Sequence, residues 1–169
     1  MASAERSLAA LEPDTRAKAG EWLRLCGSRG VAVLVYETHR SPKRQNMLYE
    51  RGRTAPGPIV TNARAWHSAH QFGRAFDAVP WSGGADLMTN KLDWSPFPSH
   101  IAEGAFIAGG GLEHLDHEWR VMADAAAEVG LEWAGRWTSF REYVHFQFLG
   151  GETISQLRAG IPLDEGRVV

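Results

Sequence analysis

The sequence contains a single cysteine, Cys26, so no disulfide can form within the chain and the fold must rely on its apolar core. Neither sign of charge dominates, because 18 lysines and arginines stand against 20 aspartates and glutamates. This balance argues against a protein dedicated to binding nucleic acid. No segment approaches the roughly 20 consecutive apolar residues that a membrane-spanning helix needs, so stable membrane insertion is not expected.

The first residues also lack the apolar stretch of a secretory signal peptide, because Glu5 and Arg6 interrupt them. We therefore expect a protein made in the cytoplasm, which needs another route to act beyond the membrane. Hydrophobic residues make up 44% of the chain, enough for one sizeable core. The length of 169 residues, without a repeat or linker, indicates a single domain, 1–169, with a core over about 11–150 and a polar tail over 151–169.

Helices and strands are both expected, in no regular order. The helices are expected from a cap at Asp14 to Gly27 or Gly30, from Ser41-Pro42 to about Arg51, and over about 115–129. The strands are expected over 31–36, 74–80 and about 143–149, with a further short strand at 59–61. Because these elements do not follow a βαβ rhythm, the pattern favours an α+β fold.

Two histidines and an aspartate carry the main chemical signal. His70 and Asp77 can both reach one ion if Gly73 turns the chain into the strand that follows. With His145 they would form a three-ligand zinc site, and a catalytic zinc site keeps its fourth position for water. Residues three apart on a strand point to opposite faces, so Glu142 must lie on the turn before the last strand to share this site. By spacing alone, a packed His145 and a polar loop around His70 are equally possible.

Other polar and aromatic groups have simpler interpretations. Two further histidines and two glutamates near the start of the third helix lack the H-E-x-x-H order of helical zinc proteases, so a solvated face is expected; these are Glu113, His114, His117 and Glu118. Cys26 falls on an apolar helix face and is expected to be a buried small hydrophobe. Three aromatic residues belong either to the core or to a substrate groove: Trp133, Trp137 and Phe140.

The ten residues from Ser68 to Asp77 match the signature S-x-H-x-x-G-x-A-x-D of the LAS or M15 zinc peptidases, which cut the stem peptides of peptidoglycan. Upstream residues extend the match: Glu37-Thr38-His39-Arg40-Ser41, Gln45, Leu48-Tyr49, Gly52-Arg53-Thr54, Pro56-Gly57 and Ile59-Val60-Thr61. With a downstream E-x-x-H at 142–145, the chain over about 11–150 resembles the CwlK and phage L-alanyl-D-glutamate endolysin branch.

This resemblance implies a small antiparallel sheet, flanked by helices, that carries one Zn²⁺ per chain. It makes His70, Asp77 and His145 the zinc ligands and Glu142 the general base that takes a proton from water and returns it to the departing amine. It also implies that Arg40 faces the substrate or the developing oxyanion.

Three further residues are candidates for substrate binding. Ser68 matches the serine of the signature, which lines the site, and Gln45 matches a residue of the upstream pattern. Trp137 lies just before the second cluster and is a candidate for the groove wall. The arginines 51, 53 and 64 are expected to be solvated, although they could meet an anionic wall polymer.

The resemblance therefore implies a zinc-dependent peptidoglycan endopeptidase, cutting L-alanyl–D-glutamate bonds as a phage endolysin that acts on the cell wall after release from the host cytoplasm. The implied partner is the stem peptide, and a monomer is expected. A D,D-carboxypeptidase or D-Ala-D-Ala dipeptidase with the same metal chemistry is the first alternative. A catalytically inactive, zinc-containing module that binds the wall or builds a virion is the alternative from another class.

Overall fold

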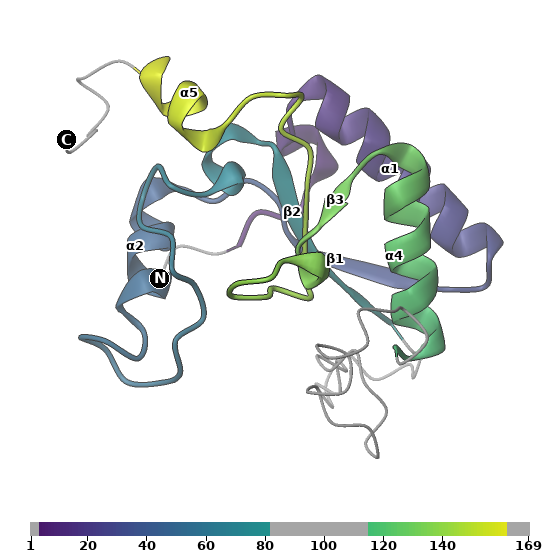
Figure 1. The fold of residues 1–169 in the computed structure, drawn as a ribbon, viewed down its shortest axis with the longest axis horizontal. Coiled ribbons are helices and arrows are strands. Elements are labelled where there is room, and N and C mark those ends of the chain that lie inside the picture. Colours follow the sequence, from purple (N-terminus) through teal and green to yellow (C-terminus); the bar gives the residue numbers. More distant parts are fainter. Residues whose placement is uncertain (1–3, 82–114, 162–169) are drawn as a thin grey trace.

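A four-stranded antiparallel sheet with the strand order β1-β2-β4-β3 forms the centre of the fold (Figure 1). Its strands are β1 (Val33–Glu37), β2 (Ala75–Pro80), β4 (His145–Gln147) and β3 (Glu132–Trp133). The computed structural model describes residues 4–81 and 115–161. The expected α+β class, with a small antiparallel sheet flanked by helices, is confirmed.

Two helices, α1 (Pro13–Ser28) and α4 (His117–Val129), lie side by side against one face of the sheet (Figure 1). The segment that begins with α2 (Pro42–Glu50) lies on the other side. The other helical elements within residues 4–81 and 115–161 are short: η1 (Leu8–Ala10), η2 (Ala69–Phe72), η4 (Ala134–Arg136) and α5 (Ile154–Ala159). None of the helices in the described ranges has the length and apolar character needed to span a bilayer.

The core lies between the sheet and the α1–α4 pair. Trp22 of α1 is fully buried, and its ring lies 5.2 Å from the ring of Phe76 on β2 and 4.7 Å from that of Phe146 on β4. Its Nε1 donates a hydrogen bond of 2.9 Å to the carbonyl of Met122 on α4. One indole therefore joins both helices to the sheet, and its polar nitrogen has a partner, as a buried donor requires.

The register of the sheet places three ionisable residues in one row. Asp77 on β2 pairs with Glu37 on β1 and with His145 on β4. Cross-strand partners point to the same face, so this row lies opposite the face on which Phe76 pairs with Phe146. The register shifts between Val35 and Glu37, and such a bulge re-aims side chains. The sheet thus separates an apolar face, covered by helices, from a polar face.

Most expected elements are present with shifted ends. The second helix begins after Ser41 and the third ends at Val129, before Gly130 at a φ of +72°, as expected. The first helix is capped by Glu12 and not by Asp14, because Pro13 takes the first helical position. The Glu12 carboxylate accepts hydrogen bonds from the free backbone amides of the first turn. The last strand is shorter than expected, and Cys26 is buried as expected.

One expected strand does not form. No strand forms at 59–61, where Ile59 and Val60 are 48% and 39% exposed and lie beside no strand of the described sheet. The expected polar tail contains α5, which begins with a capping box between Thr153 and Gln156. The short strand β3 was not expected, because two residues are too few to show an alternating pattern.

Candidate metal centre

A short 3-10 helix and a glycine position the first histidine. Ser68 caps η2 in a capping box with Gln71, which sets the start of the element that carries His70. Gly73 ends η2 with a φ of +65°, and a Cβ at this position would lie 2.9 Å from the backbone nitrogen of Glu12. The chain then enters β2, which carries Asp77. The glycine that the sequence places between the two candidate ligands therefore makes the turn that brings them together.

The three candidate ligands converge on one point. His70 Nε2 lies 3.1 Å from Asp77 Oδ1 and 3.2 Å from His145 Nδ1, and the last two atoms are also 3.2 Å apart. All three side chains are buried. A tetrahedral zinc with bonds of about 2.0–2.1 Å needs ligand atoms about 3.3–3.4 Å apart, so this triangle fits three corners of such a site. Within the described ranges, these residues are the one group of three candidate metal ligands.

Each histidine has a hydrogen-bond acceptor on its other nitrogen. His70 Nδ1 lies 2.6 Å from the carbonyl oxygen of Thr38, and His145 Nε2 lies 3.1 Å from Gln147 Oε1. Donation to these oxygens places the ring protons away from the triangle, so Nε2 of His70 and Nδ1 of His145 present lone pairs to a metal. Burial lowers the pKa of His70, which favours the neutral form that binds metal.

Arg40 binds the second carboxylate oxygen of Asp77, the one outside the ligand triangle. Its Nη2 donates to Asp77 Oδ2 at 2.6 Å and to Glu37 Oε2 at 2.8 Å, and its Nη1 donates to Gln45 Oε1 at 3.1 Å. Although burial alone would raise it, the two histidines and Arg40 hold the pKa of Asp77 well below its usual range. Arg40 is 7% exposed and lies behind Asp77, away from the side chains that line the cavity. The resemblance implied that Arg40 faces the substrate. The structure instead places Arg40 outside the set of residues that line the cavity.

Glu142 lies on the turn before β4, as its sequence position requires. The amide of His145 donates to the Glu142 carbonyl at 3.1 Å, and Glu142 Oε2 lies 3.8 Å from His145 Nδ1. Its side chain is 24% exposed and lines the cavity. Burial raises the pKa of Glu142. The carboxylate thus lies beside the metal triangle without being one of its three corners.

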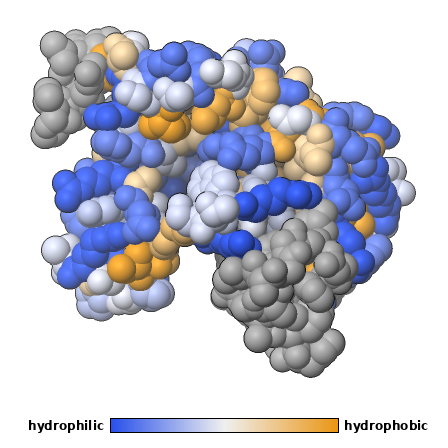
Figure 2. Space-filling view, viewed as in Figure 1, coloured by the Kyte–Doolittle hydropathy of each residue, from blue (hydrophilic) through white to orange (hydrophobic). Residues whose placement is uncertain are grey.

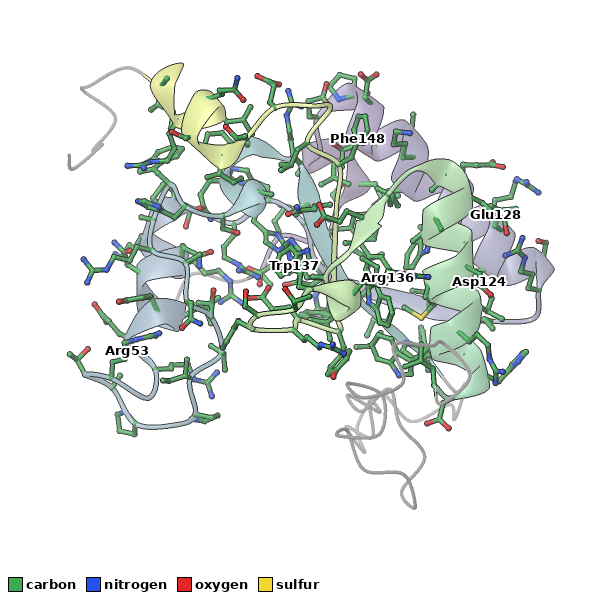
Figure 3. The ribbon with its side chains drawn as sticks, viewed as in Figure 1. Arg53, Asp124, Glu128, Arg136, Trp137 and Phe148 are labelled. Atoms are coloured by element: carbon green, nitrogen blue, oxygen red, sulfur yellow. The ribbon has the colours of Figure 1, made fainter. Side chains whose placement is uncertain are left out.

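A cavity of about 610 Å³, here called the metal cavity, opens beside Glu142 and His145. Figure 2 shows the surface hollowed between the segment that begins with α2 and the central segment after β3. Ser68 and Trp137 line this cavity, and the Trp137 ring lies 5.6 Å from the His145 ring (Figure 3). Phe140 also lines it, with a φ of +42°, a strained conformation for a residue other than glycine.

Two other expectations concern buried residues. Gln45 is fully buried and contacts Arg40, the Ala63 carbonyl and Gln71, so the structure places it behind the site and not in the cavity. Trp133 belongs to the core, where its Nε1 donates to the Tyr143 carbonyl. Of the second histidine cluster, residues 113 and 114 lie outside the described ranges, and His117 begins α4.

Three residues of the site were given no role in the sequence analysis. Glu37 receives hydrogen bonds from both Arg40 and Arg44. Gln147 accepts the His145 proton and donates to Glu132 Oε2 at 2.7 Å, and Glu132 Oε1 accepts from Trp137 Nε1 at 2.5 Å. One side-chain network therefore connects a candidate metal ligand to a wall of the cavity. Alternation along β4 was the available clue, because Gln147 shares a face with His145.

The chain is similar in sequence to two peptidases that act on peptidoglycan. The chain is 29% identical over 140 residues to the peptidoglycan L-alanyl-D-glutamate endopeptidase CwlK of Bacillus subtilis, covering 82% of this chain and 74% of that protein. It is 28% identical over 138 residues to an L-alanyl-D-glutamate peptidase of Listeria phage A118, covering 82% of this chain but 38% of that protein.

Solved structures share the fold. The Serratia marcescens L-Ala D-Glu endopeptidase ChiX has a TM-score of 0.50 at 23% identity, covering 87% of this chain and 86% of that one. The D,D-dipeptidase VanXYg has a TM-score of 0.54 at 19% identity, covering 92% of this chain and 57% of that one. An M15 peptidase family, described as D-alanyl-D-alanine carboxypeptidase, matches residues 61–148, more than half of the chain. The chain therefore belongs to the M15 peptidase family of zinc-dependent peptidases.

Proposed function

We propose that this protein is a zinc-dependent endopeptidase that cuts the L-alanyl–D-glutamate bond of peptidoglycan stem peptides. The observation that carries the proposal is the triangle of His70, Asp77 and His145, with the free carboxylate of Glu142 beside it on the wall of an open cavity. The choice of bond is supported by the names of CwlK and the Listeria phage peptidase, to which the chain is similar.

Each residue of the site has a distinct task. His70, Asp77 and His145 would hold one zinc per chain, and the metal would supply Lewis-acid chemistry at this point of the cavity. Glu142 accepts a proton from the attacking water and returns it to the departing amine, because its carboxylate borders the cavity and is not a ligand. Arg40 positions Asp77 by a hydrogen bond to its second carboxylate oxygen, and it is not among the residues that line the metal cavity.

The cavity walls bind the peptide. Ser68 and Trp137 both line the metal cavity, and the Trp137 indole is fixed by its hydrogen bond to Glu132. An aromatic ring held in this way offers a rigid apolar surface to the part of the substrate that contains alanine. Gln45 contributes to the site indirectly, because its Oε1 accepts a hydrogen bond from Arg40 Nη1.

The residue that separates catalysis from metal binding is Glu142. The variant Glu142→Gln keeps the side-chain volume but cannot accept a proton, so hydrolysis should fall by at least about 10²-fold while zinc content stays the same. A matched control is Glu128→Gln on α4, a surface glutamate paired with Arg29, which should leave turnover unchanged. Loss of zinc from Glu142→Gln would make Glu142 a ligand and would contradict the assignment.

Digestion of purified peptidoglycan with mass spectrometry of the new termini tests the bond. New glutamate amino termini are expected, whereas free D-alanine as the sole product would show a D,D-carboxypeptidase. A chelator should abolish the activity, and zinc should restore it. An uncut wall in a zymogram of the zinc-loaded protein would instead favour the inactive binding module.

The biological role that we propose is lysis of a host cell from within, as an endolysin, supported by the similarity to the Listeria phage peptidase. Production of the protein inside a bacterium should leave the cells intact until the inner membrane is permeabilised, and lysis should then follow. Survival of permeabilised cells that contain active enzyme would contradict this role. We further propose that the protein acts as a monomer, which sedimentation of the zinc-loaded protein would show.

A further inference from the structure

A second cavity of about 850 Å³ lies next to the metal cavity. Its walls come from the end of α2, from the segment after it and from α5. His67 lines both cavities, so they adjoin along the segment that leads to η2. A ligand of several residues that lies in the metal cavity can therefore continue into the second one.

Positive charge distinguishes this second cavity, here called the basic cavity. Three arginines line it, Arg53, Arg64 and Arg158, against one carboxylate, that of Glu50. Figure 3 shows Arg53 on the same side of the molecule as α2, across from Trp137 in the metal cavity. The metal cavity, by contrast, is lined by no arginine or lysine among the described residues.

Neutral partners hold two of these arginines in place. Arg53 donates to the carbonyls of Tyr49 and Thr61 and to Asn62 Oδ1, at 2.6, 3.1 and 2.7 Å. The guanidinium carbons of Arg53 and Arg64 lie 4.0 and 4.9 Å from the centre of the Tyr49 ring. Within the described ranges neither forms an ion pair with a carboxylate. The charges of Arg53 and Arg64 are thus oriented by neutral groups, which suits recognition of an anion.

The proposed substrate has its negative charge on one side of the bond that is cut. Alanine has only a methyl side chain. Glutamate has two carboxyl groups and continues a peptide through one of them, so a second carboxylate is free to carry charge. The anionic part of the substrate therefore lies on the glutamate side of the scissile amide, and the apolar part lies on the alanine side.

We propose that the basic cavity binds the carboxylates of the stem peptide on the glutamate side of the scissile bond. This inference rests on the proposed function. It gives the substrate a direction, with the glutamate side toward Arg53, Arg64 and Arg158 and the alanine side toward Trp137. Asn62 lines the metal cavity and accepts a hydrogen bond from Arg53, so the two binding regions are also in contact through protein atoms.

Binding to the zinc-loaded Glu142→Gln protein tests this inference without cleavage. The probe is a synthetic stem tetrapeptide that begins with N-acetyl-L-alanyl-D-glutamate, made once with free carboxylates beyond the scissile bond and once with those carboxylates amidated. Arg64→Gln is the test substitution. Arg64 is exposed and its guanidinium lies over the Tyr49 ring, so its replacement should not disturb the core. Arg64→Lys keeps the charge. Arg24→Gln on α1, which removes an exposed arginine paired with Glu21, is the matched control.

Calorimetry should show that Arg64→Gln weakens binding of the free-acid peptide by roughly 3–10-fold and changes binding of the amidated peptide by less than about twofold. Arg64→Lys should restore most of the loss, and Arg24→Gln should change neither affinity. Higher salt should weaken binding of the free-acid peptide to the Glu142→Gln protein, because the interaction is between charges. The same salt should have less effect on binding when Arg64→Gln is also present.

Equal losses for both peptides, or no loss for either, would overturn the inference. The result is independent of which bond is cut. If the wild-type enzyme releases only D-alanine, the proposed function fails, and the difference between the two peptides still decides whether the basic cavity binds carboxylates. If the enzyme cuts the L-alanyl–D-glutamate bond and the difference is absent, only the inference fails.

Discussion

Replacement of Gln147 tests whether the network behind His145 sets the affinity for zinc. Gln147 Oε1 accepts the proton of His145 Nε2 at 3.1 Å, on the side of the ring opposite the metal triangle. Gln147 is only 7% exposed. Removal of this acceptor lets the imidazole ring rotate and lowers the basicity of the nitrogen that binds metal. We therefore expect weaker zinc binding, although none of the three candidate ligands is altered.

The size of the effect follows from the hydrogen bond. A hydrogen bond between neutral groups contributes about 0.5–1.5 kcal/mol and one to a charged group about 1.5–3 kcal/mol, and a metal-bound imidazole lies between these cases. Since about 1.4 kcal/mol is tenfold in affinity, the expected loss is roughly 5–50-fold. This range agrees with the roughly 10–100-fold cost of losing such an outer partner of a metal ligand.

Two substitutions separate the hydrogen bond from the space that the side chain fills. Gln147 lines the metal cavity, so in Gln147→Ala a water molecule can take the place of the amide oxygen and limit the loss. Gln147→Leu fills the same space without an acceptor, so it should lie at the upper end of the range. Gln156→Ala is the control, because Gln156 contributes only to the cap of α5.

Zinc affinity is measured by competition with a chromogenic chelator, with circular dichroism as a check on folding. The zinc dissociation constant should be lowest for wild type, higher for Gln147→Ala and highest for Gln147→Leu. Gln156→Ala should have the same dissociation constant as wild type. Dissociation constants of the two Gln147 variants within about twofold of wild type would refute the argument that this network orients His145.

Two further substitutions test the support of the site. Although burial opposes ionisation, hydrogen bonds from Arg44 and Arg40 lower the pKa of Glu37 in the folded protein. The ionised Glu37 therefore stabilises the fold above the pKa it has in the unfolded chain, and this stabilisation is lost as pH falls through its folded-state pKa. Urea unfolding of the zinc-free protein should therefore show Glu37→Gln less stable than wild type at pH 7, with a difference that shrinks in acid; a difference constant with pH would contradict this. Gly73→Ala should lower the free energy of unfolding by at least about 1 kcal/mol, because alanine is strained at a φ of +65° and its Cβ meets backbone. Gly20→Ala in α1, with open space around it, should instead leave the protein as stable or more stable, and equal effects at both glycines would refute the argument.

Local patterns in the sequence indicated that His70 and Asp77 could meet, and the resemblance to the family signature selected them as candidate ligands. Gly73 was expected to turn the chain into the strand that follows, and the structure places this turn between the two residues. The position of Glu142 on a turn also followed from the two-residue period of strands. Helices with a clear cap or a terminal glycine, such as α2 and α4, were predicted close to their observed ends.

Only the tertiary structure decided what surrounds these residues. The pairing register places Asp77 between Glu37 and His145, and no local pattern encodes a register between strands that are far apart in sequence. The same long-range packing buries Arg40 behind Asp77 and away from the cavity. The arginines of the basic cavity come from separate segments, so their common charge appears only when the fold brings them together. The sequence indicated which groups are candidate zinc ligands, and the packing determined which side chains lie against them.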